Sequence, residues 1–151
     1  MNQAGDLKEL YRRTVLEHSR NPHHFGRLDQ ADQRATGHNP LCGDKCTVYV
    51  RFAHEQGAEV SFEGTGCAIC MASASIMTDA VQGKPVDRMD ATANGVLLAF
   101  SEQSTSLQGE MAALEGVRDF PSRIRCATLP WKTLQAALKG TSDTVTTETG
   151  D

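Results

Sequence analysis

Residues 64–77, GTGCAICMASASIM, decide how the rest of this chain is organised. They follow an alternating segment at 58–63, which predicts a β-strand, and they continue into a predicted helix that ends near residue 81. Two glycines thus turn a strand into a helix, and Cys67 falls on the first helical turn. The positive end of a helix dipole favours a thiolate, the form of cysteine that binds metal or attacks sulfur. On this stretch alone, a small buried cysteine at a tight turn is an equally good interpretation.

The composition excludes several classes of protein. The chain has 151 residues, enough for one domain with a sizeable core, and 39% of them are hydrophobic. A net charge of −4 argues against nucleic acid or an anionic membrane as the main partner. No apolar run reaches the length of about 18 residues that a membrane span needs, and residues 1–9 lack the apolar core of a signal peptide. We therefore expect a cytoplasmic protein without a membrane partner.

A β-hairpin brings two of the five cysteines together. Residues 47–52 are β-branched and aromatic, which predicts a strand, and residues 54–57 predict the turn that leads into the strand at 58–63. If the two strands pair in simple register, Cys42 and Cys67 lie at the same end of the hairpin. In a reducing compartment, structural disulfides are a poor explanation for an odd number of cysteines, so a metal, a redox task or burial must account for them.

The remaining segments predict helices around this hairpin. Their ranges are 6–19, 86–100, a short helix at 110–117 and a last helix at 123–138, with a loop at 101–109. Pro130 leaves open a separate turn at 126–129 followed by a helix at 130–139. We expect one domain over residues 1–140 and a disordered polar tail at 141–151. Adjacent residues in an extended turn point apart, so His23 and His24 are interpreted as solvated loop residues rather than as metal ligands.

The cysteine spacing allows two metal sites. One is a four-thiolate zinc ribbon made by Cys42, Cys46, Cys67 and Cys70, which leaves Cys126 unexplained. The other takes Cys42, Asp44, Cys67 and Cys126 and makes Cys46 and Cys70 packing residues. A carboxylate binds soft metals more weakly than thiolate does, so this second site could open a position to a partner. Spacing alone does not decide between them.

Four blocks around the cysteines resemble the iron–sulfur scaffold family of NifU N-terminal domains, IscU and SufU. The blocks are NPLCGD (39–44), FEGTGCAI (62–69), MASASIMT (71–78) and RIRCATLPWK (123–132). The resemblance extends over roughly residues 6–140. Within the family the chain is similar to the SufU type, because Arg125 stands where IscU-type proteins have a histidine. The 59-residue separation of Cys67 and Cys126 also leaves room for a SufU-type insertion.

The resemblance implies both a fold and a ligand set. The fold is α+β, a small antiparallel three-stranded sheet over about 34–63, its first strand near 34–40, packed against five or so helices as in SufE/NifU-like proteins. The metal ligands fall on Cys42, Asp44, Cys67 and Cys126. Cys46 and Cys70 depart from the family pattern, and they are either buried packing residues or, for Cys70, a thiol that resolves a persulfide or disulfide at Cys67 or competes for metal.

The implied function is iron–sulfur cluster assembly in the SUF system. A zinc-bound site accepts persulfide sulfur from a SufS-type cysteine desulfurase, whose histidine is thought to replace one zinc thiolate, and other SUF proteins are possible partners. Cys42 is the expected acceptor because its glycine-containing loop can move, whereas Cys67 is fixed at a helix start. Arg125 either holds Asp44, steers the persulfide or is solvated. We expect an assembly protein rather than an enzyme, with zinc-dependent sulfurtransferase activity left open.

Two other functions remain as alternatives. The same ligands could assemble a [2Fe–2S] cluster from iron and sulfur, although the missing histidine before Cys126 weakens this interpretation. A structural zinc-ribbon interaction module is the alternative from another class of protein. It predicts that Cys126→Ser keeps zinc and Cys46→Ser loses it, whereas the Cys42–Asp44–Cys67–Cys126 site predicts the reverse.

Overall fold

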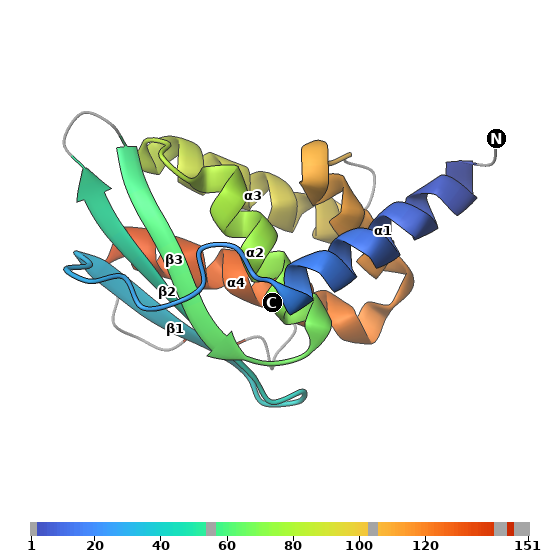
Figure 1. Ribbon diagram of the computed structural model, residues 1–151, viewed down its shortest axis with the longest axis horizontal. Helices are drawn as coiled ribbons and strands as arrows, with labels where there is room; N and C mark the ends of the chain where they lie inside the picture. Colours follow the sequence, from blue (N-terminus) through green and yellow to red (C-terminus); the bar gives the residue numbers. More distant parts are fainter. Residues whose placement is uncertain (1–2, 54–56, 103–105, 141–144, 147–151) are drawn as a thin grey trace.

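The computed structural model describes residues 3–53, 57–102, 106–140 and 145–146 (Figure 1). The helices are α1 (Gln3–Arg20), α2 (Ala68–Val81), α3 (Val86–Glu102), α4 (Pro121–Lys139) and the 3₁₀ helix η1 (Gly109–Asp119). The strands are β1 (Gln33–Asn39), β2 (Asp44–Ala53), β3 (Gly57–Thr65) and the short β4 (Val145–Thr146). The predicted α+β class is confirmed, and none of the helices in the described ranges is long and apolar enough to cross a membrane.

The sheet has the order β3-β2-β1-β4, and β1, β2 and β3 form the predicted three-stranded antiparallel unit. The hairpin is confirmed by the pairing of Ala53 with Gly57, although residues 54–56 of its turn lie outside the described ranges. β4 adds a two-residue parallel strand at the edge of β1. It belongs to the stretch 141–151 that we expected to be a disordered tail, whose other residues lie outside the described part of the chain.

One face of the sheet is buried because alternate residues of a strand point the same way. On β2 the inward row runs from Val50 and Val48 through Cys46 to Asp44, all of which are buried. The strand register continues this row across β1, where Asn39 lies opposite Asp44. The alternation that builds the apolar core therefore also carries a carboxylate to the buried end of the sheet.

Helices α2 and α4 cover this face, and the remaining helices pack outside them (Figure 1). α4 contacts β1 and β2, and α2 contacts β3. The two helices are joined by the buried Ser73, whose hydroxyl donates to the carbonyl of Ala127 at 2.6 Å and accepts from the indole of Trp131 at 3.0 Å. This contact fixes the relative position of the elements that carry Cys67 and Cys126.

Two helical segments differ from the sequence-based expectation. α4 is continuous from 121 to 139, so the separate turn at 126–129 is wrong. Leu129, Pro130 and Trp131 are all buried, and this packing outweighs the hydrogen bond that a proline removes from a helix interior. The segment predicted as a short helix at 110–117 is instead the 3₁₀ helix η1.

Candidate metal centre

Three separate elements bring sulfur and carboxylate groups together at one end of the sheet. Cys42 lies in the loop between β1 and β2, Asp44 begins β2, and Cys126 lies on α4. One ligand atom from each lies within 4.8 Å of the other two, and the Sγ atoms of Cys42 and Cys126 are 3.6 Å apart. Cys67 adjoins this cluster, because its backbone N–H donates to Asp44 Oδ1 at 2.9 Å. The predicted set Cys42, Asp44, Cys67 and Cys126 is therefore gathered in one place.

The loop that carries Cys42 is folded around Asn39. The Asn39 carbonyl accepts hydrogen bonds from the backbone N–H groups of Cys42 at 3.3 Å and Gly43 at 2.8 Å. Gly43 has φ +76°, in the left-handed region that glycine adopts readily. The turn leaves Cys42 exposed, whereas Asp44 and Cys126 are fully buried. Cys42 is thus the most exposed thiol of this cluster, since Cys67 is half-buried.

Asp44 is a buried carboxylate with one oxygen unsatisfied. Oδ1 accepts the N–H of Cys67, but Oδ2 is buried without a hydrogen-bond partner among the described residues. Burying an ionised group without a partner is costly, so such a group is normally paired or bound to metal. A cation held between Asp44 and the neighbouring sulfurs would satisfy Oδ2. The donor set fits a zinc ion on this ground, since thiolates and a carboxylate are its usual ligands.

Cys67 occupies the N-cap position of α2. A hydrogen bond from the Cys126 thiol lowers the pKa of Cys67 to about 6, against the opposing effects of burial and of Asp44. The backbone N–H groups of Cys70 and Ile69 lower this pKa further, although Cys67 makes no side-chain capping hydrogen bond. The thiolate that the sequence predicts at this helix start is therefore favoured by a neighbouring thiol as well as by the helix.

Cys126 stays protonated, because its pKa is raised. Its hydrogen bond to Cys67 is the largest cause that raises the pKa of Cys126, followed by burial and by a hydrogen bond to Asp44. In the metal-free protein Cys126 is thus a protonated thiol beside Cys67 and Asp44. Metal binding to cysteines releases protons of this kind, so the position is one that a cation can take.

The basic residue in contact with the sulfurs is Arg123 rather than Arg125. A hydrogen bond to the Cys126 sulfur raises the pKa of Arg123, which is exposed at the entrance to the cluster. Within the described ranges Arg125 makes no ion pair with Asp44, and its side chain is half-buried. Arg123 precedes Cys126 by three positions, which places both on one helix face, so helical spacing could have identified it.

Asn39 is the other residue that sequence reasoning missed. It is fully buried, and its Nδ2 lies 3.8 Å from the Cys126 sulfur while its Oδ1 accepts the Leu41 N–H at 3.2 Å. A single side chain thus supports both the loop of Cys42 and the sulfur of Cys126. Its position opposite Asp44 follows from the β1–β2 register, which the sequence alone did not supply.

Cys46 and Cys70 lie in the apolar core, each 1% exposed. Burial raises the pKa of Cys46 to about 12, and it raises the pKa of Cys70 as well, with Cys46 the next cause. Both thiols therefore stay protonated at neutral pH. Among the described residues, the cluster around Asp44 contains neither of them, which favours packing roles over a zinc ribbon.

Comparison with known proteins identifies the family of this chain. A family described as NifU-like N terminal domain matches residues 10–140, so the chain belongs to this family of iron–sulfur cluster assembly scaffold proteins. A relative from Streptococcus pyogenes serotype M1, "Iron-sulfur cluster assembly scaffold protein IscU", is 40% identical over 88% of this chain and 85% of its own. The "Zinc-dependent sulfurtransferase SufU" of Bacillus subtilis (strain 168) is 36% identical over 89% of this chain and 93% of its own.

Solved structures share the fold. A putative iron–sulfur cluster assembly scaffold protein for the SUF system from Fervidobacterium islandicum AW-1 superimposes with a TM-score of 0.78 at 28% identity. The match covers 86% of this chain and 97% of that one. A NifU-like N-terminal protein from Brucella abortus gives a TM-score of 0.77 at 26% identity, over 88% and 94% of the two chains.

Proposed function

We propose that this protein is a zinc-binding sulfur acceptor of the SUF system, which takes persulfide sulfur from a SufS-type cysteine desulfurase in the cytoplasm. The observation that carries the proposal is the buried Asp44 Oδ2, which lacks a hydrogen-bond partner among the described residues and lies in a cluster with the sulfurs of Cys42 and Cys126. The relative named as a zinc-dependent sulfurtransferase supports the choice of metal.

Cys42, Asp44, Cys67 and Cys126 would hold the zinc ion, with Asn39 and Arg123 supporting the sulfur of Cys126. When bound, zinc keeps thiolates deprotonated and shields them from oxidants. The carboxylate is the weaker donor of the set, and it keeps the site exchangeable. Cys67 and Cys126 are held by a helix start and a buried helix face, so they are the rigid ligands.

The sulfur-transfer step falls to Cys42, which is exposed on a loop. Its thiolate attacks the outer sulfur of the desulfurase persulfide. A new S–S bond forms on Cys42, the S–S bond of the partner breaks, and the partner cysteine leaves as a thiolate. No net oxidant is needed, because one persulfide is exchanged for another. The cationic Arg123 beside the cluster would attract the anionic persulfide.

The test is metal analysis of the purified chain together with a desulfurase assay. We expect one zinc ion at the thiol site and a stimulation of the desulfurase that Cys42→Ser abolishes. Cys126→Ser should lose this zinc, whereas Cys46→Ser should keep it. The opposite pattern of the last two variants would establish the zinc ribbon instead, and unaltered stimulation by Cys42→Ser would exclude Cys42 as the acceptor.

A scaffold function is the second candidate, supported by the 40% identical relative that is named as a cluster assembly scaffold. In this case the same four residues would hold a [2Fe–2S] cluster, or iron on the way to it. A brown protein that builds a cluster with iron and sulfide and donates it to an apoprotein would favour this function. A colourless zinc protein that accepts sulfur would favour the first.

A further inference from the structure

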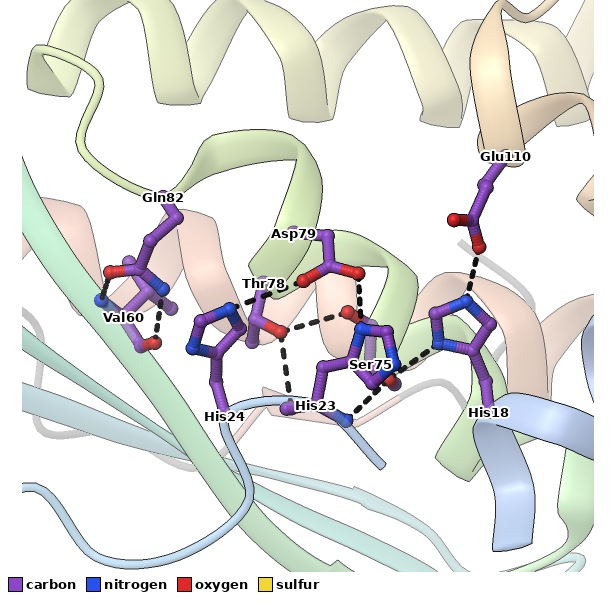
Figure 2. A network of polar contacts seen from close by, with 9 residues as sticks. All are labelled: His18, His23, His24, Val60, Ser75, Thr78, Asp79, Gln82 and Glu110. Atoms are coloured by element: carbon purple, nitrogen blue, oxygen red, sulfur yellow. Dashed lines mark hydrogen bonds and ion pairs between the residues drawn. The ribbon is translucent and has the colours of Figure 1, made fainter. Parts of the chain in front are cut away.

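A second group of metal-ligating side chains lies away from the cysteines, beside the C-terminal end of α1 (Figure 2). It consists of His18 on α1, His23 in the loop that follows, and Asp79 on α2. One ligand atom from each lies within 4.8 Å of the other two. We propose that these three residues form a second site for a divalent transition-metal ion, independent of the thiol site.

The histidines converge because the loop after α1 is tied down on both sides. The loop pairs with β3 through hydrogen bonds between His24 and Phe62 and between Gly26 and Phe62. His24 has φ +53°, and this left-handed residue reverses the chain so that neighbouring imidazoles reach one carboxylate. His23 Nδ1 contacts Asp79 Oδ2, and His24 Nε2 contacts Asp79 Oδ1 at 3.1 Å (Figure 2). The expectation that the two histidines point apart is wrong for this reason, although both side chains are exposed to solvent as predicted.

The hydrogen bonds of His18 prepare one nitrogen as a ligand. Its Nε2 contacts Glu110 on η1, and its Nδ1 lies 2.6 Å from Ser75 Oγ (Figure 2). Ser75 Oγ already accepts the backbone N–H of His23 at 2.7 Å, so its own proton is available to His18 Nδ1. With the ring proton on Nε2, facing Glu110, Nδ1 is the nitrogen that can bind an ion, once the Ser75 hydroxyl that it accepts in the metal-free chain has turned away. A carboxylate behind a histidine is the usual outer partner of a metal-bound imidazole.

The remaining geometry suits an open, exchangeable site. His18 is 2% exposed, whereas the His23 and Asp79 side chains are 42% and 36% exposed, so the ligands span from the interior to solvent. The rings of His18 and His23 have centroids 4.5 Å apart. Ligand atoms around a tetrahedral zinc ion are about 3.4 Å apart, given metal–ligand distances of about 2.1 Å. The ligand atoms of His18, His23 and Asp79 lie within 4.8 Å of one another, so binding an ion requires the exposed His23 and Asp79 side chains to shift and the Ser75 hydroxyl to turn away from His18 Nδ1.

Charge and chemistry identify the class of ion. With neutral histidines, Asp79 and Glu110 bring two negative charges to the group, which a dication offsets. Imidazole and carboxylate ligands suit Zn²⁺, Fe²⁺ and similar ions, whereas Mg²⁺ and Ca²⁺ prefer oxygen alone. The bound ion would join α1, the loop after it and α2, and Glu110 would extend the connection to η1.

The test is a titration of the metal-free, full-length chain with Zn²⁺ against a competing chromogenic chelator. We expect two ions per chain, and one ion per chain for His23→Ala or Asp79→Asn. Both residues are partly exposed, so these variants are expected to fold, which circular dichroism checks. A single ion in the unaltered chain that Cys42→Ser removes would overturn the proposal, and so would a second ion that His23→Ala retains.

Two control variants sharpen the result. Asp87→Asn, an exposed carboxylate on α3, should leave both ions bound. His24→Asn tests the contact between His24 and the proposed ligand Asp79. Asparagine is chosen because it tolerates the left-handed conformation of residue 24. This substitution should lower the affinity for the second ion by about 10–100-fold without abolishing binding, as loss of an outer-shell contact does. Abolition equal to that in His23→Ala would overturn the assignment of the ligands.

Co²⁺ distinguishes this proposal from the function of the thiol site. Thiolate ligands give Co²⁺ an intense near-ultraviolet charge-transfer band, and imidazole and carboxylate ligands do not. His23→Ala should keep this band and lose one ion, whereas Cys42→Ser should weaken the band and keep the second ion. Loss of the second ion in Cys42→Ser would show that the sites are not independent and would overturn the proposal.

Discussion

At the scale of single residues, the thiol site depends on how closely the backbone of Gly66 approaches Asp44. A Cβ atom at Gly66 would lie 2.6 Å from Asp44 Oδ1 and 3.2 Å from its Cγ. The carboxylate is buried and its Oδ1 is held by the Cys67 N–H, so it cannot move aside without losing that bond. Glycine at position 66 therefore leaves the space that the Asp44 carboxylate occupies.

Gly66→Ala should therefore weaken zinc binding at the thiol site by about 10–100-fold, the usual cost of disturbing a residue behind a metal ligand. Competition with a chelator measures the change in affinity. Gly95→Ala on α3 is the matched control, since a Cβ there meets nothing within 4 Å. It should leave zinc affinity unchanged and stabilise the helix by about 0.5–1 kcal/mol. Equal affinities of the two variants would contradict the role given to Gly66.

Cys67 allows a prediction about pH. Its pKa of about 6 means that, in the metal-free protein, the thiolate predominates above pH 6 and is lost as pH falls through that value. We expect iodoacetamide to label Cys67 with a half-maximal rate near pH 6, measured by peptide mass spectrometry. Because the Cys126 thiol is the largest cause of the shift, Cys126→Ala should move this midpoint upward.

Cys46 provides an internal control for that experiment. Its pKa of about 12 and its burial should leave it unlabelled at neutral pH in the folded chain and labelled after unfolding. A labelling midpoint for Cys67 near the ordinary thiol value of about 8.5 would show that the Cys126 contact does not form.

At the scale of elements, the site requires α2 and α4 to keep a fixed relative position. Ser73 is buried between them and serves both as donor to Ala127 and as acceptor for Trp131. Removing its hydroxyl would leave the indole N–H of Trp131 buried without this partner. Loss of a partner in the interior costs more than the net value of the hydrogen bond that is lost.

Ser73→Ala should accordingly lower the free energy of unfolding by about 1–3 kcal/mol, as measured by urea denaturation. Ser101→Ala is the control, because Ser101 is exposed and, in the described part of the chain, its hydroxyl bonds only to the Leu98 carbonyl within α3. That variant should change stability by less than about 0.5 kcal/mol. Similar losses in both variants would show that the α2–α4 contact contributes little.

The elements also show which parts of the site could be predicted from the sequence. Local patterns predicted the β2–β3 hairpin and the helix after Cys67, so the proximity of Cys42 and Cys67 followed from short-range pairing. Cys126 reaches the site from a helix 59 residues farther on, and spacing alone left a zinc ribbon equally open. The resemblance to a known family, rather than periodicity, selected Cys126.

The parts that were missed depend on long-range packing. The continuity of α4 through Pro130 comes from burial of its neighbours, which propensity does not describe. The support of Cys126 by Asn39 needs the β1–β2 register, and the shared carboxylate of His23 and His24 needs a left-handed residue and the docking of α2. In each case the local pattern was compatible with several outcomes, and tertiary contacts chose one.

At the scale of the whole molecule, the thiol site joins the β1–β2 loop, the start of α2 and α4, so a metal ion bound there would stabilise the whole fold. In the metal-free protein Asp44 Oδ2 is buried without a hydrogen-bond partner among the described residues, which is costly for the fold. Zinc binding would replace this cost with ligand bonds. A residue that serves a metal site in this way lowers the stability of the metal-free chain.

Asp44→Asn should consequently have opposite effects on the two forms. The substitution keeps an acceptor for the Cys67 N–H but replaces the buried carboxylate with a neutral amide, so the metal-free variant should melt at a higher temperature than the metal-free chain that retains Asp44. Both proteins carry Asp79→Asn in this experiment, so that only the thiol site responds to zinc. At free zinc about 100 times Kd, the chain that retains Asp44 should gain about 2.7 kcal/mol, or about 5–10 °C in Tm. The variant should gain clearly less, because a neutral amide is a poor zinc ligand.

Differential scanning calorimetry measures both shifts, with Mg²⁺ as the control ion that should shift neither. A lower Tm for the metal-free Asp44→Asn variant would mean that the carboxylate stabilises the fold without metal, and its buried oxygen would then need a different explanation.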